Sequence, residues 1–252
     1  MTVNIQTSPS LVSTLTITEP HSLGTALLQS LLTILTKEID SPTRVLILTA
    51  SHPEALLADV DALKRMTPTE AFDFSELGQK VCAAIEALPY PVIAAIDGLA
   101  LGGGCELTLA SDLVYATERA QFGQIEVRGG VIPGFGGTWR LARRVGDFKA
   151  RELLYTGTML DAQSAKAAGL VTDVFDGSGL LERVNVIATT IANIAPLAIR
   201  AAKMMLFTNR DLSLQASNKL ESQLFSSLFG TADQKEGMSA FLEKRVPKFV
   251  GA

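Results

Sequence analysis

Glycines and acidic residues near the middle of the chain could together stabilise an anion and move protons. Three glycines, Gly102-Gly103-Gly104, precede Cys105-Glu106, in a turn that follows a buried apolar strand and opens a helix. Backbone N–H groups at a helix N-terminus stabilise negative charge through unpaired donors and the helix dipole, and glycine allows close approach of a ligand. The turn therefore predicts a site for a phosphate or for an oxyanion developing on a carbonyl.

The spacing of the glycines argues against the two common phosphate motifs. No Lys-Ser or Lys-Thr pair follows them, as a P-loop requires, and a Gly-x-Gly-x-x-Gly fingerprint would need glycine where Leu107 stands. The oxyanion interpretation is therefore favoured.

Two acidic residues accompany the glycines. Glu106 falls on the first turn of the expected helix, where a carboxylate often only complements the helix dipole. A second acid, Glu126, ends the run Phe122–Glu126 and precedes another glycine-rich loop, Pro133–Thr138. Generic surface loops rarely carry so many special backbone positions, so this second feature indicates a functional site with a pair of carboxylates.

Composition limits the classes of protein to which the chain can belong. Its 252 residues are 47% hydrophobic but only 6% aromatic, which predicts an aliphatic core with helices packed closely on a sheet. The formal net charge of −4 is spread along the chain, without the basic patch that nucleic acid requires. Cys82 and Cys105 lie far apart without ligand-like neighbours, which argues against a structural metal and fits a reducing compartment.

Hydrophobicity along the chain predicts a protein of the cytoplasm. No apolar run approaches the roughly 18 residues of a membrane span. The segment Met1–Pro9 lacks the basic and apolar regions of a secretory signal. We therefore expect no membrane association.

The order of apolar and amphipathic segments predicts an α/β protein with a helical C-terminal part. Strands separated by helices favour parallel pairing through right-handed crossovers. From Ala195 to Arg245 the period is almost entirely helical. We expect a glycine turn over Gly98–Gly104, with its helix starting at Cys105. The other segments expected are strands at Val3–Gln6, Ser13–Thr18, Arg44–Thr49, Pro91–Asp97 and Asp112–Thr117, and helices at Leu23–Ile39 and Ser75–Leu88.

These motifs, in this order, resemble those of the crotonase superfamily and most closely the enoyl-CoA hydratases. The resemblance covers nearly the whole chain and is carried by Pro91–Leu107, Ala120–Glu126, Ile132–Thr138, Ala165–Val171 and Asp233–Arg245. It implies a crotonase-like spiral of ββα units over residues 1–194, which bind acyl-CoA and catalyse, and a C-terminal helical subdomain over residues 195–252 used in trimerisation. It also implies a homotrimer or homohexamer, and no cofactor other than the coenzyme A of the substrate.

The resemblance also implies the roles of individual residues. The backbone N–H groups of Ala58 and Gly103 would form an oxyanion hole for the thioester oxygen. Glu106 and Glu126, 126 − 106 = 20 positions apart, would be the catalytic pair of the hydratase branch. Substrate-binding positions carried over from the family are Ala58, Asp59, Val60, Gly102, Gly103 and Gly134.

The resemblance thereby implies syn-type addition of water to a 2-trans-enoyl-CoA, giving 3-hydroxyacyl-CoA. The oxyanion hole would stabilise the enolate, Glu106 would deprotonate the water, and Glu126 would give a proton to the α-carbon. The alternatives are another crotonase-type reaction, such as double-bond isomerisation, or a non-catalytic homologue that binds acyl-CoA.

One departure from the family pattern concerns the oxyanion loop. Leu57 stands where the family usually has glycine, and a positive φ there would strain the loop. Trp139 occupies a position that is usually polar, and we expect it to serve packing.

Overall fold

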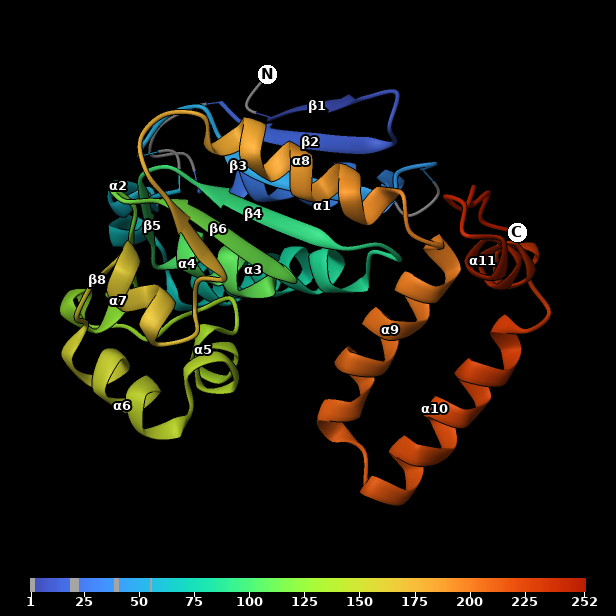
Figure 1. The fold of residues 1–252 in the computed structure, drawn as a ribbon. Helices are drawn as coiled ribbons and strands as arrows, with labels where there is room; N and C mark the ends of the chain where they lie inside the picture. The colour runs from blue at the N-terminus through green and yellow to red at the C-terminus, as the bar shows by residue number, and fades with distance from the viewer. Residues whose placement is uncertain (1–2, 19–22, 39–40, 55) are drawn as a thin grey trace.

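A six-stranded sheet forms the centre of the molecule (Figure 1). The computed structural model describes residues 3–18, 23–38, 41–54 and 56–252. The strand order is β1-β2-β3-β4-β6-β9, with all neighbours parallel except β1 and β2. The parallel pairing predicted from the sequence is therefore confirmed for all but the first pair. The strands of this sheet are β1 Val3–Thr7, β2 Val12–Ile17, β3 Val45–Ala50, β4 Val92–Ile96, β6 Leu113–Thr117 and β9 Asp173–Phe175.

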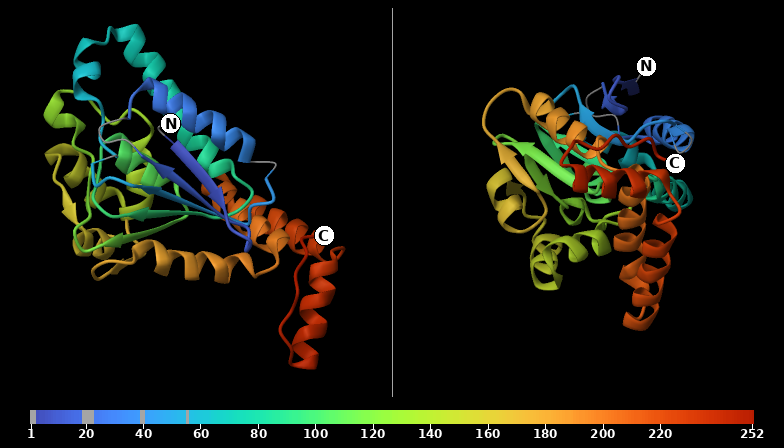
Figure 2. Two further views of the ribbon diagram at one scale, coloured as in Figure 1. Left: turned by 90° about the horizontal axis from the view of Figure 1, so that it is seen from above. Right: turned by 45° about the vertical axis from the view of Figure 1, so that its right-hand side comes forward.

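Helices cover both faces of this sheet, which explains why its central strands are apolar throughout. Helices α1 (Thr25–Glu38) and α3 (Pro68–Ala87) pack their apolar faces on one side. Helix α8 (Leu180–Ala192) packs on the other side. All five residues of β4 are buried, as expected of a strand enclosed between two layers. Figure 2 shows the same layers from two further directions.

A second, three-stranded sheet continues from the end of β4. It consists of β5 Leu99–Leu101, β7 Gln121–Gly123 and β8 Leu160–Asp161, in that order. The short helix α4 (Gly103–Ala110) follows β5, and every one of its residues is buried. The prediction of a glycine turn over Gly98–Gly104 was wrong, because part of this segment is strand β5 and the helix already starts at Gly103.

Among the remaining helices of the first part of the chain, α7 (Ala162–Ala167) packs on strands β7 and β8 of this second sheet. Helix α3 begins at Pro68, earlier than predicted, because Thr67 caps its first turn in a capping box with Glu70. The others are α2 Val60–Arg65, the 3₁₀ helix η1 Glu126–Gly129, α5 Gly137–Val145 and α6 Asp147–Thr156.

The chain ends in helices, as its sequence predicted. In Figure 1 α9 and α10 project together from one end of the core, and α11 lies next to their base. The elements are α9 Pro196–Thr208, the 3₁₀ helix η2 Asn209–Asp211, α10 Leu214–Leu228 and α11 Ala232–Glu243. In the part of the chain described, no single helix is long and apolar enough to cross a membrane. Helices α8 and α9 together have the required length and composition, but they are bent by 104° relative to each other.

Candidate active site

The first turn of α4 presents an unpaired backbone donor. Gly102 precedes the helix with φ of 54°, a conformation that favours glycine, and its N–H donates to the Gly123 carbonyl oxygen at 2.8 Å. The next N–H, that of Gly103, has no acceptor among the described residues. This is the donor expected at a helix start, held by the pairing of β5 with β7.

The loop after β3 lies against the same turn. Leu56 forms an isolated parallel bridge with Ala100. Its carbonyl oxygen is so close to Gly104 that a β-carbon there would come within 2.1 Å of it. Only glycine permits this approach, which brings the segment containing Ala58 to the N-terminus of α4. The Ala58 N–H also lacks an acceptor among the described residues.

The altered residue in this loop causes no backbone strain. Among the described non-glycine residues, positive φ occurs at Leu11 and Lys244 but not at Leu57. The carbonyl of Leu57 accepts the Leu23 N–H at 3.3 Å, which ties the loop to the start of α1. The strain considered for Leu57 from the sequence is therefore absent.

Glu106 is a buried carboxylate held by two backbone donors. Its side chain lies on the first turn of α4, and the residue is 1% exposed. Its Oε1 accepts the N–H of Phe135 at 2.7 Å and that of Gly137 at 2.6 Å. Burial, with the charge of Glu126, raises the pKa of Glu106 to about 7, although the two N–H donors oppose the shift.

Glu126 faces the same space from η1. A β-carbon on Gly102 would lie 3.2 Å from Glu126 Oε1, so this carboxyl group lies beside the start of α4. With the amide of Gln124 turned so that its nitrogen faces Glu126, it donates to the two carboxyl oxygens at 2.9 and 3.1 Å. Burial raises the pKa of Glu126 to about 7.

Two carboxyl groups with such pKa values can hold one proton between them at neutral pH. They interact electrostatically, so they titrate as a pair rather than as independent groups. A site of this kind supplies one acid and one base for proton transfer at adjacent atoms.

The other residues expected at the site have more local roles. Asp59 caps α2 by accepting the Ala62 N–H at 2.9 Å. Val60, the first residue of α2, is 72% exposed. The Gly134 carbonyl accepts the hydroxyl of Ser75 at 2.5 Å, which attaches the second glycine loop to α3.

Three residues at the site were not singled out from the sequence. Gln124 and Phe135 lie inside the quoted motifs, so their position was a usable signal. Arg140 carried no such signal in the sequence, because a cation on a short amphipathic helix is usually solvated. In the structure Arg140 is only 5% exposed. Trp139 packs against the guanidinium groups of Arg140 and Arg143, at 4.1 and 4.8 Å from its ring centre.

Comparison with known proteins shows the family to which the chain belongs. The sequence profile of the family described as Enoyl-CoA hydratase/isomerase matches residues 8–252. The chain belongs to this family. A crotonyl-CoA hydratase of Syntrophomonas wolfei is 42% identical over 213 residues, which cover 84% of this chain and 82% of the relative. A short-chain-enoyl-CoA hydratase of Clostridium acetobutylicum is 40% identical over 210 residues, covering 82% of this chain and 80% of the relative.

Solved structures of the family share the fold. An enoyl-CoA hydratase from Bacillus anthracis superimposes with a TM-score of 0.94 at 35% identity, covering 100% of both chains. An enoyl-CoA hydratase from Geobacillus kaustophilus gives 0.94 at 28% identity, covering 100% of this chain and 97% of its own. The crotonase-like fold and family expected from the sequence are confirmed.

A methyl group added at Gly103 should disrupt the site. The new β-carbon of Gly103→Ala would lie 2.7 Å from the Phe135 ring, which is itself buried and cannot move freely. We expect a loss of about 1–3 kcal/mol in the free energy of unfolding, measured in urea. Gly129→Ala is the matched control, because no atom lies within 4 Å of its β-carbon position, and it should change stability by less than about 0.5 kcal/mol. Equal stability of the two variants would contradict this packing.

Proposed function

We propose that this protein is an enoyl-CoA hydratase that adds water to short-chain 2-trans-enoyl-CoA thioesters, giving 3-hydroxyacyl-CoA. The observation that carries the proposal is the pair of buried carboxyl groups with raised pKa values beside unpaired N–H donors at the start of α4. The names of the two curated relatives support both the reaction and the short acyl chain. No cofactor is needed for this chemistry.

The N–H groups of Gly103 and Ala58 would bind the thioester oxygen. Attack at the β-carbon moves negative charge onto that oxygen, forming an enolate. Donors fixed before the reaction need no reorganisation, and losing one typically costs about 10²–10³ in rate. Burial of the turn strengthens this effect, since little water competes for the charge.

Glu106 would act as the base and Glu126 as the acid. Two N–H donors on Oε1 favour the carboxylate form of Glu106, while its Oε2 accepts no hydrogen bond from the described residues. That oxygen takes a proton from the water as the water oxygen bonds to the β-carbon. Glu126 gives its proton to the α-carbon, and the enolate returns to a thioester carbonyl. A proton passing from Glu106 to Glu126 restores the starting state. With water and proton both coming from this one pair of carboxyl groups, we propose syn addition.

The alternative reactions use fewer of these features. Double-bond isomerisation moves one proton between two carbons and needs no second acid to activate water. A non-catalytic homologue would gain nothing from burying two ionisable groups, which weakens the fold at neutral pH. We therefore place hydration ahead of both.

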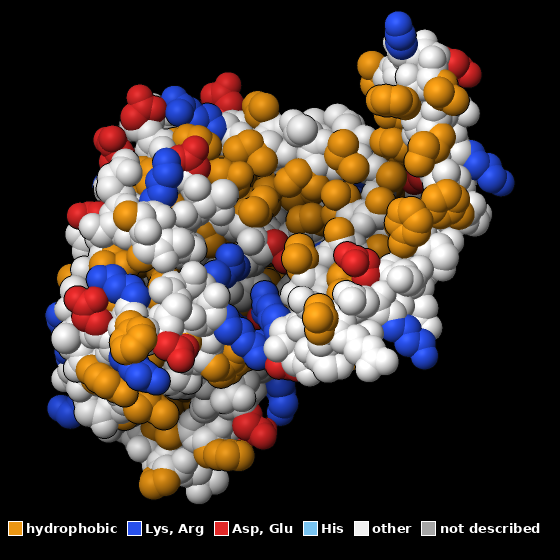
Figure 3. Space-filling view, turned by 60° about the horizontal axis from the view of Figure 1, so that its bottom comes forward, with side chains coloured by type: hydrophobic (Ala, Val, Ile, Leu, Met, Phe, Trp, Pro, Cys, Tyr) orange, Lys and Arg blue, Asp and Glu red, His pale blue; other side chains and the backbone are white. Residues whose placement is uncertain are grey.

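The C-terminal helices would join copies of this chain. Figure 3 shows apolar side chains spread over the projecting helices and the surface facing them. Among them Leu206, Leu214, Phe241 and Leu242 are each more than 70% exposed, which is costly unless a partner covers them. We propose residues 1–194 as the catalytic core, residues 195–252 as the assembly part of a homotrimer or homohexamer, and Asp59, Val60 and Gly134 as further positions contacting the acyl-CoA.

Crotonyl-CoA should lose its conjugated absorbance when the protein is added. Glu106→Gln and Glu126→Gln should each reduce kcat by about 10²–10⁴, because each removes one proton-transfer group. Glu118→Gln, at an exposed position, is the control and should match the wild type. A wild-type protein that binds the thioester without hydrating it would refute the proposed function.

The pH dependence of kcat/KM, which reports the acid and base of the free enzyme, should be bell-shaped with a maximum near pH 7, because both carboxyl groups have pKa values of about 7. At lower pH both are protonated and no base remains; at higher pH both are ionised and no acid remains. Rates measured between about pH 5 and 9 should fall on both sides. A rate that is constant over this range would contradict the paired-carboxylate mechanism.

A further inference from the structure

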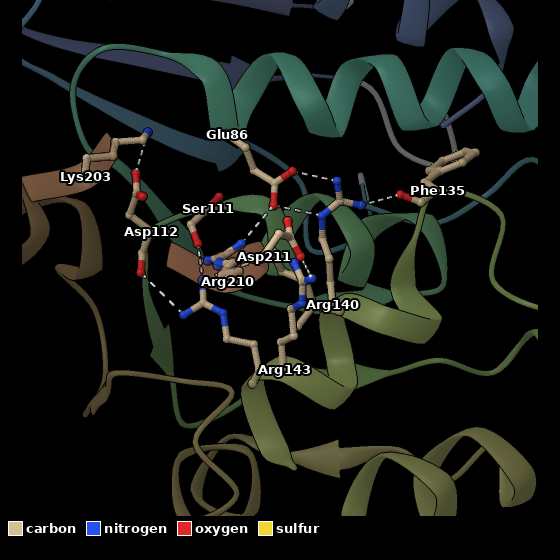
Figure 4. Close-up of polar contacts among 11 residues, drawn as sticks. Glu86, Ser111, Asp112, Phe135, Arg140, Arg143, Lys203, Arg210 and Asp211 are labelled. Atoms are coloured by element: carbon tan, nitrogen blue, oxygen red, sulfur yellow. Dashed lines mark hydrogen bonds and ion pairs between the residues drawn. The ribbon is translucent and has the colours of Figure 1, made fainter. Parts of the chain in front are cut away.

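Beneath the proposed site lies a buried ion pair that takes no direct part in the chemistry. The guanidinium of Arg140 on α5 donates from Nε to Glu86 Oε1 at 3.0 Å and from Nη2 to Glu86 Oε2 at 2.7 Å. The two side chains are 6% and 7% exposed. Figure 4 shows this two-pronged contact between α5 and the end of α3. Such a pair is rigid, since both groups lose stabilisation if they separate.

The remaining Arg140 donor reaches the backbone of the second glycine loop. Its Nη1 donates to the Phe135 carbonyl oxygen at 2.6 Å. Gly136 has φ of 96°, and a β-carbon there would come within 2.3 Å of the same nitrogen. The turn therefore folds closely around the guanidinium. The N–H groups on either side, those of Phe135 and Gly137, bind Glu106 Oε1.

The ring of Phe135 connects this turn to the oxyanion hole. It lies so close to Gly103 and Gly78 that β-carbons there would come within 2.7 and 2.0 Å of ring atoms. It also packs edge-on against Phe74, with 5.2 Å between ring centres. A shift of the turn would therefore move both the Glu106 donors and the residue that presents the oxyanion N–H.

Other titratable and charged groups lie near Glu106 and the Arg140–Glu86 pair. Glu126, Cys82 and Cys105 are the titratable groups that interact with Glu106, together with the fixed charge of Arg140. Arg210 of η2 approaches Glu86 Oε1 at 3.6 Å, so the C-terminal helices contact the same carboxylate. Arg143, one turn along α5, instead points to Asp211 at 3.0 Å and is 40% exposed (Figure 4).

We propose that Arg140, clamped by Glu86, is a positioning residue for hydration: it fixes the 135–137 turn so that two N–H groups bind one oxygen of Glu106 and leave the other for the water. The proposal rests on the proposed function. Its positive charge also opposes the burial that raises the pKa of Glu106, which favours the base form.

The variant Arg140→Lys keeps the positive charge at this position but removes the fixed hydrogen bonds of the guanidinium. Lysine keeps a cation next to Glu86, so the fold should survive, but it cannot bond both Glu86 oxygens and the Phe135 carbonyl in the fixed geometry of a guanidinium. We expect kcat to fall about 10- to 100-fold with KM little changed, because the water-activating group is misplaced. The acidic limb of the profile should move to higher pH less than in the double variant described next, because the cation that favours the Glu106 carboxylate is kept.

The double variant Glu86→Gln/Arg140→Met removes both charges of the buried pair, and Arg210, which loses its contact with Glu86, is partly exposed to water. We expect the same fall in kcat, now with the acidic limb moved to higher pH, since the Arg140 cation no longer favours the Glu106 carboxylate. Arg143→Met, on the same helix, is the matched control and should leave kcat and the limb unchanged.

These outcomes separate the two proposals. A wild type inactive towards crotonyl-CoA would refute the function. An active wild type with Arg140→Lys within twofold of its kcat, after correction for folded fraction, would refute the positioning role alone. A fall in thermal stability without a fall in kcat would likewise show that Arg140 serves only the fold.

Discussion

Everything at this site depends on burying the Glu106 carboxylate next to a second carboxyl group. Removing a carboxylate from water is costly unless hydrogen bonds replace the lost hydration. The 135–137 turn supplies two N–H donors to one oxygen, and Arg140 holds that turn from below. The compensation is partial, so the pKa of Glu106 stays near 7 instead of returning to the usual value of a glutamate. An incompletely compensated charge is what a base working at neutral pH requires.

The fold meets this requirement by bringing distant segments to one edge of the sheet. The loop after β3 and the connection from β4 through β5 reach the start of α4 together, since parallel strands end on the same side. Glycine at 104 allows the contact with Leu56, and glycine at 103 makes room for the Phe135 ring. Because α4 is buried along its whole length, its donors are fixed before any substrate arrives.

Much of this arrangement could be predicted from the sequence. The apolar run in β4 predicted a buried strand, and the glycines with Glu106 and Glu126 predicted a candidate site, whose catalytic roles stay a prediction. The start of α4 was misplaced because glycine has low helix propensity, whereas here close packing on Leu56 and Phe135 outweighs propensity. Arg140 could not be identified, since nothing in a sequence distinguishes a buried, paired arginine from a solvated one on an amphipathic helix. Likewise, the effect of Leu57 depended on a backbone angle that its residue type does not fix.

The central claim is that Glu106 and Glu126 share one proton at neutral pH. The most direct measurement is a carbon NMR titration of the protein labelled at glutamate side-chain carboxyls, with the two resonances assigned from Glu106→Gln and Glu126→Gln. The account predicts that both resonances change with midpoints near pH 7 and that each replacement lowers the midpoint of the partner. Two resonances that titrate independently, with midpoints near the ordinary glutamate value of about 4.3, would contradict it.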